Sequence, residues 1–187
     1  MALRQILTGY TGMVPAVIQM TQGIGGKPAL VPEQSLRFNL AHAGARAALA
    51  VPRDREVGID LEPIDPGLEV SPLLAVACSQ TEAARIAALA PLARPKAFLT
   101  CWTLKEAYLK GIGAGLSCDP RTIEIALLPD DCVIVTDLLA ERVDPQWCAR
   151  LLHPGSGWVA AVTAPGHVQS IAMHDWPPPR EIAGAGD

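Results

Sequence analysis

The sequence has few charged residues and lacks any long hydrophobic run. Only 18% of its 187 residues are charged, 50% are hydrophobic, and the formal net charge is -4. No apolar stretch approaches the roughly 18 residues of a membrane span, and Arg4 and Gln5 interrupt the N-terminus where a signal peptide is apolar. The composition excludes a disordered chain and a nucleic-acid binder with a basic surface. We therefore expect a chain with a hydrophobic core and neither a membrane nor a nucleic-acid partner.

Other absences narrow the chemistry. The five cysteines are widely spaced without a C-x-x-C pair, which indicates neither a disulfide framework nor a zinc site and favours the cytoplasm. No G-x-S-x-G or H-E-x-x-H motif is present, so nothing indicates a hydrolase or a zinc protease of those types. Four lysines stand against eleven arginines, which draws attention to Lys27, Lys105 and Lys110 as positions where a compact ammonium is needed.

Hydrophobic spacing and turn residues predict an α+β protein. In the first part, the pattern predicts a helix at 3–10, strands at 17–21, 36–40, 47–51 and 57–62, and a glycine-rich loop at 23–28. The segment 63–72 contains three prolines and a glycine, and we interpret it as a linker. These features predict a first half at residues 1–66.

The second half, residues 67–176, is predicted to begin with a capping box formed by Ser79 and Glu82. A long helix follows at 96–110 and ends at Gly111 and Gly113. Strands are predicted at 122–127, 132–136, 147–152, 157–163 and 169–174. The tail at 177–187 is expected to be disordered.

The segment VGIDLE, residues 57–62, places two carboxylates on one face of a strand. Asp60 and Glu62 point to the side opposite Ile59 and Leu61, because alternate side chains of a strand share a face. Two carboxylates at this spacing suit Mg²⁺, which leaves its remaining positions to water and phosphate. A half-buried strand with two acids on its wet face explains the same pattern.

A second candidate is the helix around WTLKEAYLK. Phe98, Trp102, Glu106 and Lys110 recur every four residues and form one stripe. The stripe begins with aromatic residues that should face the core, and it continues into a carboxylate and an ammonium. Either Glu106 and Lys110 stand at the mouth of a cleft, or they form an ordinary exposed ion pair.

Two further features are weaker. In GGKP, residues 25–28, glycines before Lys27 let backbone N–H groups and an ammonium approach a phosphate, although the segment alone favours a simple turn. His42, in FNLAHAG, is either a ligand or a histidine at the end of a strand. Neither feature decides a function alone.

In order, GKP, FNLAHAG, VGIDLE and WTLKEAYLKGIGAGL resemble the motifs of 4′-phosphopantetheinyl transferases of the surfactin-synthetase type. The resemblance covers roughly residues 3–176. Its most specific part is G-x-D-x-E on a strand followed by W-x-x-K-E-x-x-x-K on a helix. It implies two similar α+β halves related by a pseudo-twofold axis, with coenzyme A in the cleft between them.

The resemblance also implies an activity and a set of site residues. Such bacterial, cytoplasmic enzymes move the phosphopantetheine arm of coenzyme A to a serine of an apo acyl or peptidyl carrier protein, and they release adenosine 3′,5′-bisphosphate. By motif position, the implied roles are Mg²⁺ binding by Asp60, Glu62 and Glu106, pyrophosphate binding by Lys105 and Lys110, and 3′-phosphate binding by Lys27 and His42. Glu106 is the expected base, directly or through a metal-bound water, and Lys110 is expected to stabilise the leaving phosphate.

The sequence departs from the family pattern in two places. The usual S-H-S motif is Ala41-His42-Ala43 here, so a hydroxyl group that would bond coenzyme A is missing. The first half is also expected to be N-terminally shortened, through a start assigned too far downstream, a truncated gene or a real loss, and the chain alone is expected to be poorly soluble or weakly active. An alternative function therefore stands beside the transferase: a degenerate homologue that binds coenzyme A or a carrier protein without transfer.

Overall fold

A five-stranded antiparallel sheet forms the centre of the computed structural model, which describes residues 2–31, 36–128, 132–138, 147–168 and 170–177. The strand order is β5-β9-β8-β7-β6. The bounds are β5 Gly58–Pro63, β6 Ile123–Leu127, β7 Cys132–Asp137, β8 Trp147–Leu152 and β9 Trp158–Pro165. β9 lies between β5 and β8, so its apolar residues are buried on the inside of the sheet.

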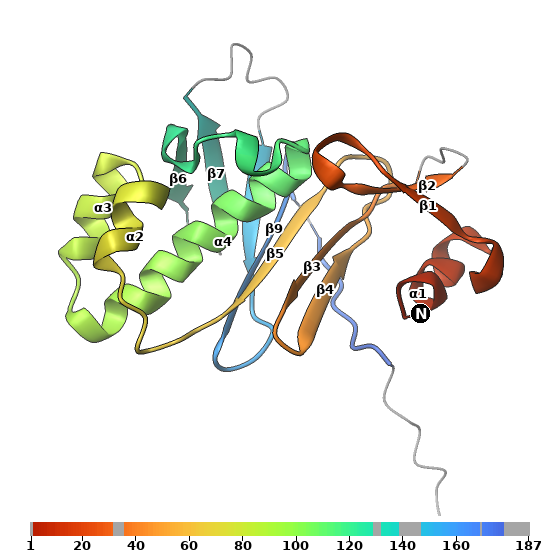
Figure 1. Ribbon diagram of the computed structural model, residues 1–187, viewed down its shortest axis with the longest axis horizontal. Helices are drawn as coiled ribbons and strands as arrows, with labels where there is room; N and C mark the ends of the chain where they lie inside the picture. Colours follow the sequence, from red (N-terminus) through yellow and green to blue (C-terminus); the bar gives the residue numbers. More distant parts are fainter. Residues whose placement is uncertain (1, 32–35, 129–131, 139–146, 169, 178–187) are drawn as a thin grey trace, which may run out of the picture.

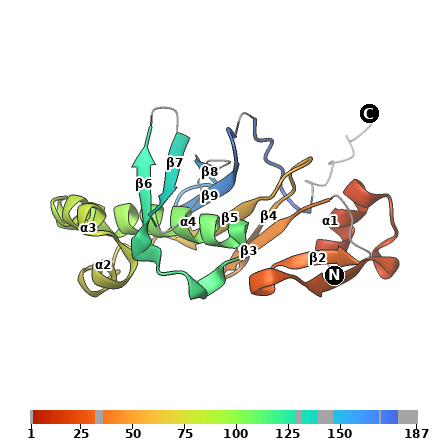
Figure 2. The same ribbon diagram turned by 90° about the horizontal axis from the view of Figure 1, so that it is seen from above.

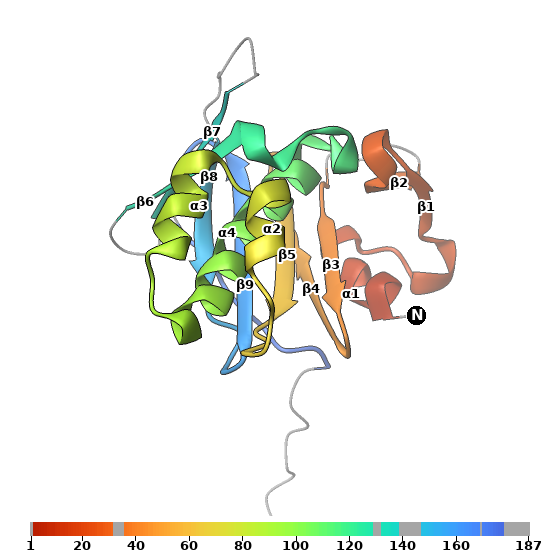
Figure 3. The same ribbon diagram turned by 60° about the vertical axis from the view of Figure 1, so that its left-hand side comes forward.

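Three helices pack on one side of this sheet. They are α2 Ser71–Ala77, α3 Gln80–Ala87 and α4 Arg94–Ile112. α4 crosses β5 and β9, while α2 and α3 gather near its N-terminal end (Figures 1 and 3). The largest group of buried side chains lies between these helices and the sheet, with Leu104 and Ala107 of α4 fully buried.

The described residues between 2 and 50 form a smaller layer beside β5. It contains α1 Ala2–Thr11, the hairpin of β1 Gln19–Gln22 and β2 Pro28–Val31, and the hairpin of β3 Asn39–Ala43 and β4 Arg46–Ala50. Seen from above, α1 and β2 lie at the end of the molecule opposite α2 and α3 (Figure 2). This layer has its own core, in which Leu7, Ile18, Leu30 and Phe38 are buried together.

β3 is joined to β5 through a side chain. The buried Asn39 accepts a hydrogen bond from the backbone N–H of Ile59 at 2.8 Å through its Oδ1 atom. The amide thus satisfies a buried backbone donor that would otherwise cost free energy. Asn39 thereby fixes the smaller layer against the strand that carries Asp60.

α4 lies unusually close to β5 because Gly58 has no side chain. A Cβ atom at Gly58 would lie 1.8 Å from the carbonyl oxygen of Ala107 and 2.5 Å from the backbone nitrogen of Gly111. Gly113 then ends the helix with a left-handed φ of 71°, a conformation that favours glycine. The glycine of G-x-D-x-E therefore sets the distance between the strand and the helix.

Most predicted elements are confirmed. α1, α4, β1 and every strand from β4 to β9 begin and end within two residues of the predicted ranges, and the capping box of Ser79 and Glu82 is present at the start of α3. The structure also confirms the mixture of helices and antiparallel sheet. β3 begins at Asn39, three residues after the predicted start. Gly111 lies inside α4, and Gly113 ends the helix.

Two predictions about elements are wrong. The segment 63–72 was interpreted as a linker, but α2 begins inside it, with Pro72 in its first turn, where a proline costs no hydrogen bond. β2 was not predicted, and only its first residue, Pro28, lay in the predicted loop at 23–28. The predicted strand at 169–174 is absent from residues 170–174, while residue 169 lies outside the described residues. β5 and β8 already pair with the two sides of β9, so the chain that follows β9 cannot add a strand next to it.

The predicted division at 63–72 falls between β5 and α2. β5 belongs by sequence to the predicted first half, yet it pairs with β9 of the second. Of the predicted tail, residues 178–187 lie outside the described residues. No helix in the described part of the chain is both long enough and apolar enough to cross a membrane.

The close contact at Gly58 predicts a large cost for one methyl group. Gly58→Ala should lower the free energy of unfolding by about 1–3 kcal/mol or more, because the new Cβ meets backbone atoms that cannot turn away. Gly9→Ala is the matched control, since a Cβ at this exposed position of α1 meets no atom within 4 Å. Urea unfolding of the parent and both variants measures the difference, and equal midpoints for both variants would contradict this packing.

Candidate functional site

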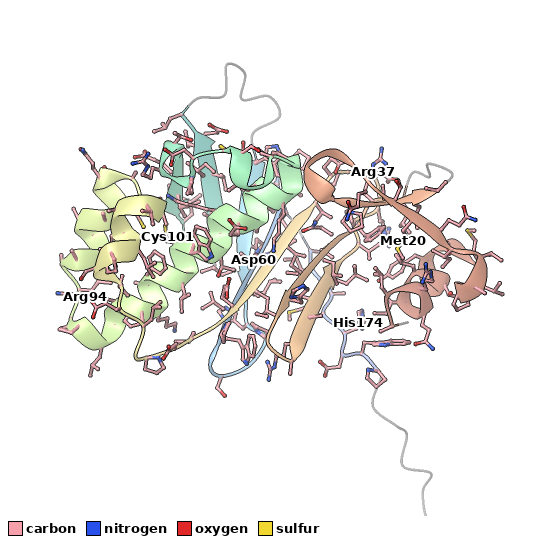
Figure 4. All side chains as sticks on the ribbon, viewed as in Figure 1. Met20, Arg37, Asp60, Arg94, Cys101 and His174 are labelled. Carbon is pink, nitrogen blue, oxygen red and sulfur yellow. The ribbon has the colours of Figure 1, made fainter. Side chains whose placement is uncertain are left out.

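Asp60 and Lys110 form an ion pair between β5 and α4. Lys110 Nζ donates to Asp60 Oδ1 at 2.6 Å, with side-chain exposures of 31% for Lys110 and 5% for Asp60. The other carboxylate oxygen, Asp60 Oδ2, is buried and has no hydrogen-bond partner. Figure 4 shows Asp60 on β5, beside α4. The close packing at Gly58 thus places a largely buried carboxylate next to the C-terminal part of the helix.

Glu62 and Glu106 extend this group of acids. Burial raises the pKa of both carboxyl groups, the Asp60 carboxylate raises both further, and Lys110 opposes the increase. A hydrogen bond from Trp102 also lowers the pKa of Glu62. Glu106 Oε1 is buried without a partner. The structure therefore brings Asp60, Glu62, Glu106 and Lys110 into one electrostatic group.

Two buried, unpartnered carboxylate oxygens are the observation that fits a divalent cation. Buried acceptors normally have a donor, so Asp60 Oδ2 and Glu106 Oε1 need an explanation. A hard cation provides one, since Mg²⁺ is commonly bound by one or two carboxylates together with water and phosphate oxygens. The ligand oxygens of Asp60, Glu62 and Glu106 are not all within 4.8 Å of one another in the described structure. These residues therefore fit a site in which water and phosphate oxygens supply further ligands, rather than a site in which the protein supplies all of them.

Cys78, Glu82 and Cys101 form a tighter group of residues of the kinds that bind metals, away from Asp60. Atoms of Cys78, Glu82 and Cys101 lie within 4.8 Å of one another, in the core near α2 and α3. The carboxylate of Glu82 already accepts hydrogen bonds from Ser79, Ile125 and Lys105. Lys105 itself supplies the positive charge, so this group is a satisfied core cluster rather than the predicted metal site.

Lys105 does not join the acids, and its predicted place beside a pyrophosphate does not fit the structure. Its side chain is 0% exposed, and Nζ donates to Glu82 Oε2 at 2.5 Å and to the carbonyl oxygens of Ala77 and Pro120, each at 2.9 Å. These bonds use all three donors of the ammonium. Lys105 points toward α2 and α3 and joins α4 to both helices through Ala77 and Glu82.

Lys27 lies at the junction of the two layers. Nζ donates to Glu56 Oε2 at 2.6 Å, to the carbonyl oxygen of Val57 at 2.9 Å and to that of Gly111 at 3.0 Å, and the side chain is 14% exposed. All three donors are therefore in use. The structure gives Lys27 a role in holding the loop after β1 against β5 and α4.

His42 lies apart from the acids. It is exposed on β3, opposite Ala47 of β4, and it does not line the cleft described below. Its neighbour Ala41 is 2% exposed and packs with Ile59, Leu61 and Ala160. An apolar side chain at position 41 therefore fits the core, which gives a physical reason for the departure from S-H-S.

A small cleft opens beside Lys110 where the loop after β1 meets the end of α4. Its volume is about 190 Å³, and its lining comprises Gly25, Gly26, Lys27, Pro28, Asn39, Leu40, Lys110, Gly113 and Gly115. A Cβ at Gly25 would lie 2.1 Å from the carbonyl oxygen of Gly113, so the two backbones touch. Glycine backbone next to an ammonium is a typical setting for phosphate. The volume is below the about 300–1,000 Å³ of a drug-sized ligand, which suits only part of a large one.

The sequence analysis gave no role to three residues that build this site. Gly58 permits the contact between helix and strand, Asn39 fixes β5, and a hydrogen bond from Trp102 lowers the pKa of Glu62. Trp102 lay in the predicted stripe with Glu106, which indicated its side of the helix but not its contact with Glu62. The contacts of Gly58 and Asn39 are made through space and leave no mark in the local pattern.

Known proteins are similar to this chain in sequence. A family model described as the 4′-phosphopantetheinyl transferase superfamily matches residues 56–163. The 4′-phosphopantetheinyl transferase HetI of Nostoc sp. is 35% identical over 88% of this chain and 68% of its own length. The transferase AcpT of Escherichia coli K12 is 36% identical over 60% of this chain and 56% of its own.

A more distant relative is the L-aminoadipate-semialdehyde dehydrogenase-phosphopantetheinyl transferase of Eremothecium gossypii. It is 32% identical over 64% of this chain and 45% of its own length. The chain thus spans between 45% and 68% of these three relatives. The matched region 56–163 contains β5 and α4, the two elements that carry the acids.

The raised pKa of Glu106 predicts how the stability of the metal-free protein depends on pH. Between the ordinary and the raised pKa, the folded state binds more protons than the unfolded state, so stability falls as pH rises through this window. Glu106→Gln removes the ionisation. In EDTA, the variant should unfold at a higher temperature than the parent at neutral pH, and the difference should shrink toward about pH 4, near the ordinary pKa of a glutamic acid.

The matched control is Glu69→Gln, which changes an exposed acid. Thermal unfolding followed by circular dichroism across this pH range measures the effect. A Glu106→Gln protein that is less stable than the parent at neutral pH would contradict the crowding of acids between β5 and α4.

Proposed function

Because the chain belongs to the 4′-phosphopantetheinyl transferase superfamily, we propose that it transfers the phosphopantetheine arm of coenzyme A to a serine of an apo carrier protein. The proposal includes Mg²⁺ dependence, release of adenosine 3′,5′-bisphosphate and the surfactin-synthetase type of the family. Its main support is the pair of buried, unpartnered oxygens on Asp60 and Glu106, two carboxyl groups that interact electrostatically.

In this proposal, Asp60, Glu62 and Glu106 hold Mg²⁺. When bound, the ion offsets the negative charge of the pyrophosphate and of the phosphate that leaves. The chain contributes a preformed, partly dry arrangement of carboxylates, and Trp102 donates to one of them. Such preorganisation lowers the cost of ordering the groups when the substrate arrives.

The glycine-lined cleft is the proposed place for the phosphates of coenzyme A. Lys110 borders both this cleft and the acids, so its ammonium can stabilise the phosphate group that leaves. Residues on both sides of the segment 63–72 line the cleft. This lining supports the family arrangement of two halves around coenzyme A, which we propose together with its pseudo-twofold relation.

Glu106 is the proposed base for the carrier serine. Its pKa is raised by burial and by Asp60, which makes its carboxylate a better proton acceptor than an ordinary one. The serine oxygen forms a bond to the phosphorus next to pantetheine, the bond to the adjoining phosphate breaks, and the serine proton goes to Glu106 or to a water beside it. The second phosphate leaves on adenosine 3′,5′-bisphosphate.

The 3′-phosphate remains to be placed. We propose His42 for it, because this side chain is exposed on the strand that also contributes to the cleft. Lys27 joins this proposal through its position in the lining, where its ammonium can turn from Glu56 toward an anion while the backbone bonds keep the loop in place. Lys105 has no part in it.

The direct experiment incubates the chain with coenzyme A, Mg²⁺ and an apo acyl carrier protein, and measures mass added to the carrier. The parent should add one phosphopantetheine group, and Asp60→Asn should slow the reaction by about 100-fold or more, because a preorganised electrostatic contact is lost. Glu69→Gln, which alters an exposed acid outside the site, should react like the parent.

A binding measurement separates this function from the alternative. Coenzyme A binding with no mass added to any carrier would favour the degenerate, non-catalytic homologue. Parent-like transfer by Asp60→Asn would contradict the assignment of the metal ligands.

A further inference from the structure

Lys110 belongs to two parts of the site at once. Its ammonium donates to Asp60 Oδ1 at 2.6 Å, and its side chain also lines the glycine cleft beside Gly25 and Gly113. We propose that Lys110 is an internal counter-cation that competes with the divalent cation for Asp60, and that phosphate in the cleft draws it away. This inference rests on the metal assignment of the proposed function.

The acids need a cation even before any ligand binds. Asp60 is 5% exposed, and Lys110 Nζ lies 2.6 Å from its Oδ1 atom. Asp60 Oδ2 and Glu106 Oε1 are both buried without a hydrogen-bond partner. Neighbouring carboxylates that are shielded from water repel one another, and the Lys110 ammonium reduces this repulsion.

Lys110 is also able to leave. Its side chain is 31% exposed and stands near the C-terminal end of α4, next to open space in the cleft. Lys105 and Lys27 are held more firmly, since each makes three hydrogen bonds and is at most 14% exposed. Among the lysines of the site, Lys110 combines a partner on the acids with access to the cleft.

Competition has a thermodynamic consequence. A divalent cation added alone must approach carboxylates that already hold an ammonium, so it should bind weakly. A phosphate compound that attracts Lys110 frees the carboxylate, and the cation in turn makes the ammonium available to the phosphate. Each ligand should therefore strengthen the binding of the other, as linkage requires.

The test is calorimetric titration with Mg²⁺ alone, without coenzyme A. Lys110→Met removes the competing charge and should bind Mg²⁺ about tenfold more tightly than the parent at low ionic strength. Lys110→Arg keeps the charge and should bind like the parent. Lys96→Met is the matched control, because Lys96 is exposed at the other end of the same helix.

Thermal unfolding of each variant, with and without Mg²⁺, shows whether the protein is folded under the conditions of the titration. If Lys110→Met is unfolded without the ion, Lys110→Gln takes its place, since the amide can still donate to Asp60. Equal Mg²⁺ affinity in the parent and in the uncharged variant would overturn the inference and leave the transferase proposal standing.

Absence of Mg²⁺ binding by all the proteins would overturn both the metal assignment and the inference. Tighter binding by the uncharged variant, together with a parent that transfers nothing to a carrier, would support the competition and contradict the proposed function. The titration and the transfer assay together distinguish a failure of the inference from a failure of the proposed function.

Discussion

The approach of α4 to β5 at Gly58 is the constraint on which the site depends. Without a side chain at that position, the backbone of the helix can lie against the strand, and a single methyl group would meet the Ala107 carbonyl oxygen at 1.8 Å. Two residues further along β5, Asp60 then faces Lys110 across the contact. The motif glycine is therefore part of the site geometry, although it offers no functional group of its own.

Charge balance distinguishes the buried pair of Lys105 and Glu82 from the pair of Lys110 and Asp60, in which Lys110 is 31% exposed. Lys105 and Glu82 form a closed pair in which both groups have a full set of partners, so the pair joins helices and holds nothing else. Asp60 and Lys110 form an open pair, with three acids against one ammonium and two carboxylate oxygens left without donors. A cation would balance the excess negative charge of the acids, and the glycine-lined cleft beside them is suited to a phosphate.

The sequence predicted which strand and which helix hold the site better than it predicted the contacts of each residue. Alternation placed Asp60 and Glu62 on one face of β5, and four-residue spacing grouped Trp102, Glu106 and Lys110 on α4, because both patterns are local. Lys105 was misplaced since successive helical residues point about 100° apart, so a neighbour of Glu106 in sequence need not be its neighbour in space. Asn39 and Lys27 make contacts with residues distant in sequence, and no pattern could show them.

The central claim is that Asp60 and Glu106 share one cation because β5 and α4 hold them together. A double-mutant cycle on Mg²⁺ affinity in the presence of coenzyme A tests it, using Asp60→Asn, Glu106→Gln and the combined variant. If the two carboxylates act on the same ion, the combined variant should lose much less affinity than the sum of the two single losses, since either change already breaks the shared site. Fully additive losses would show that the two residues act independently, and would contradict the account.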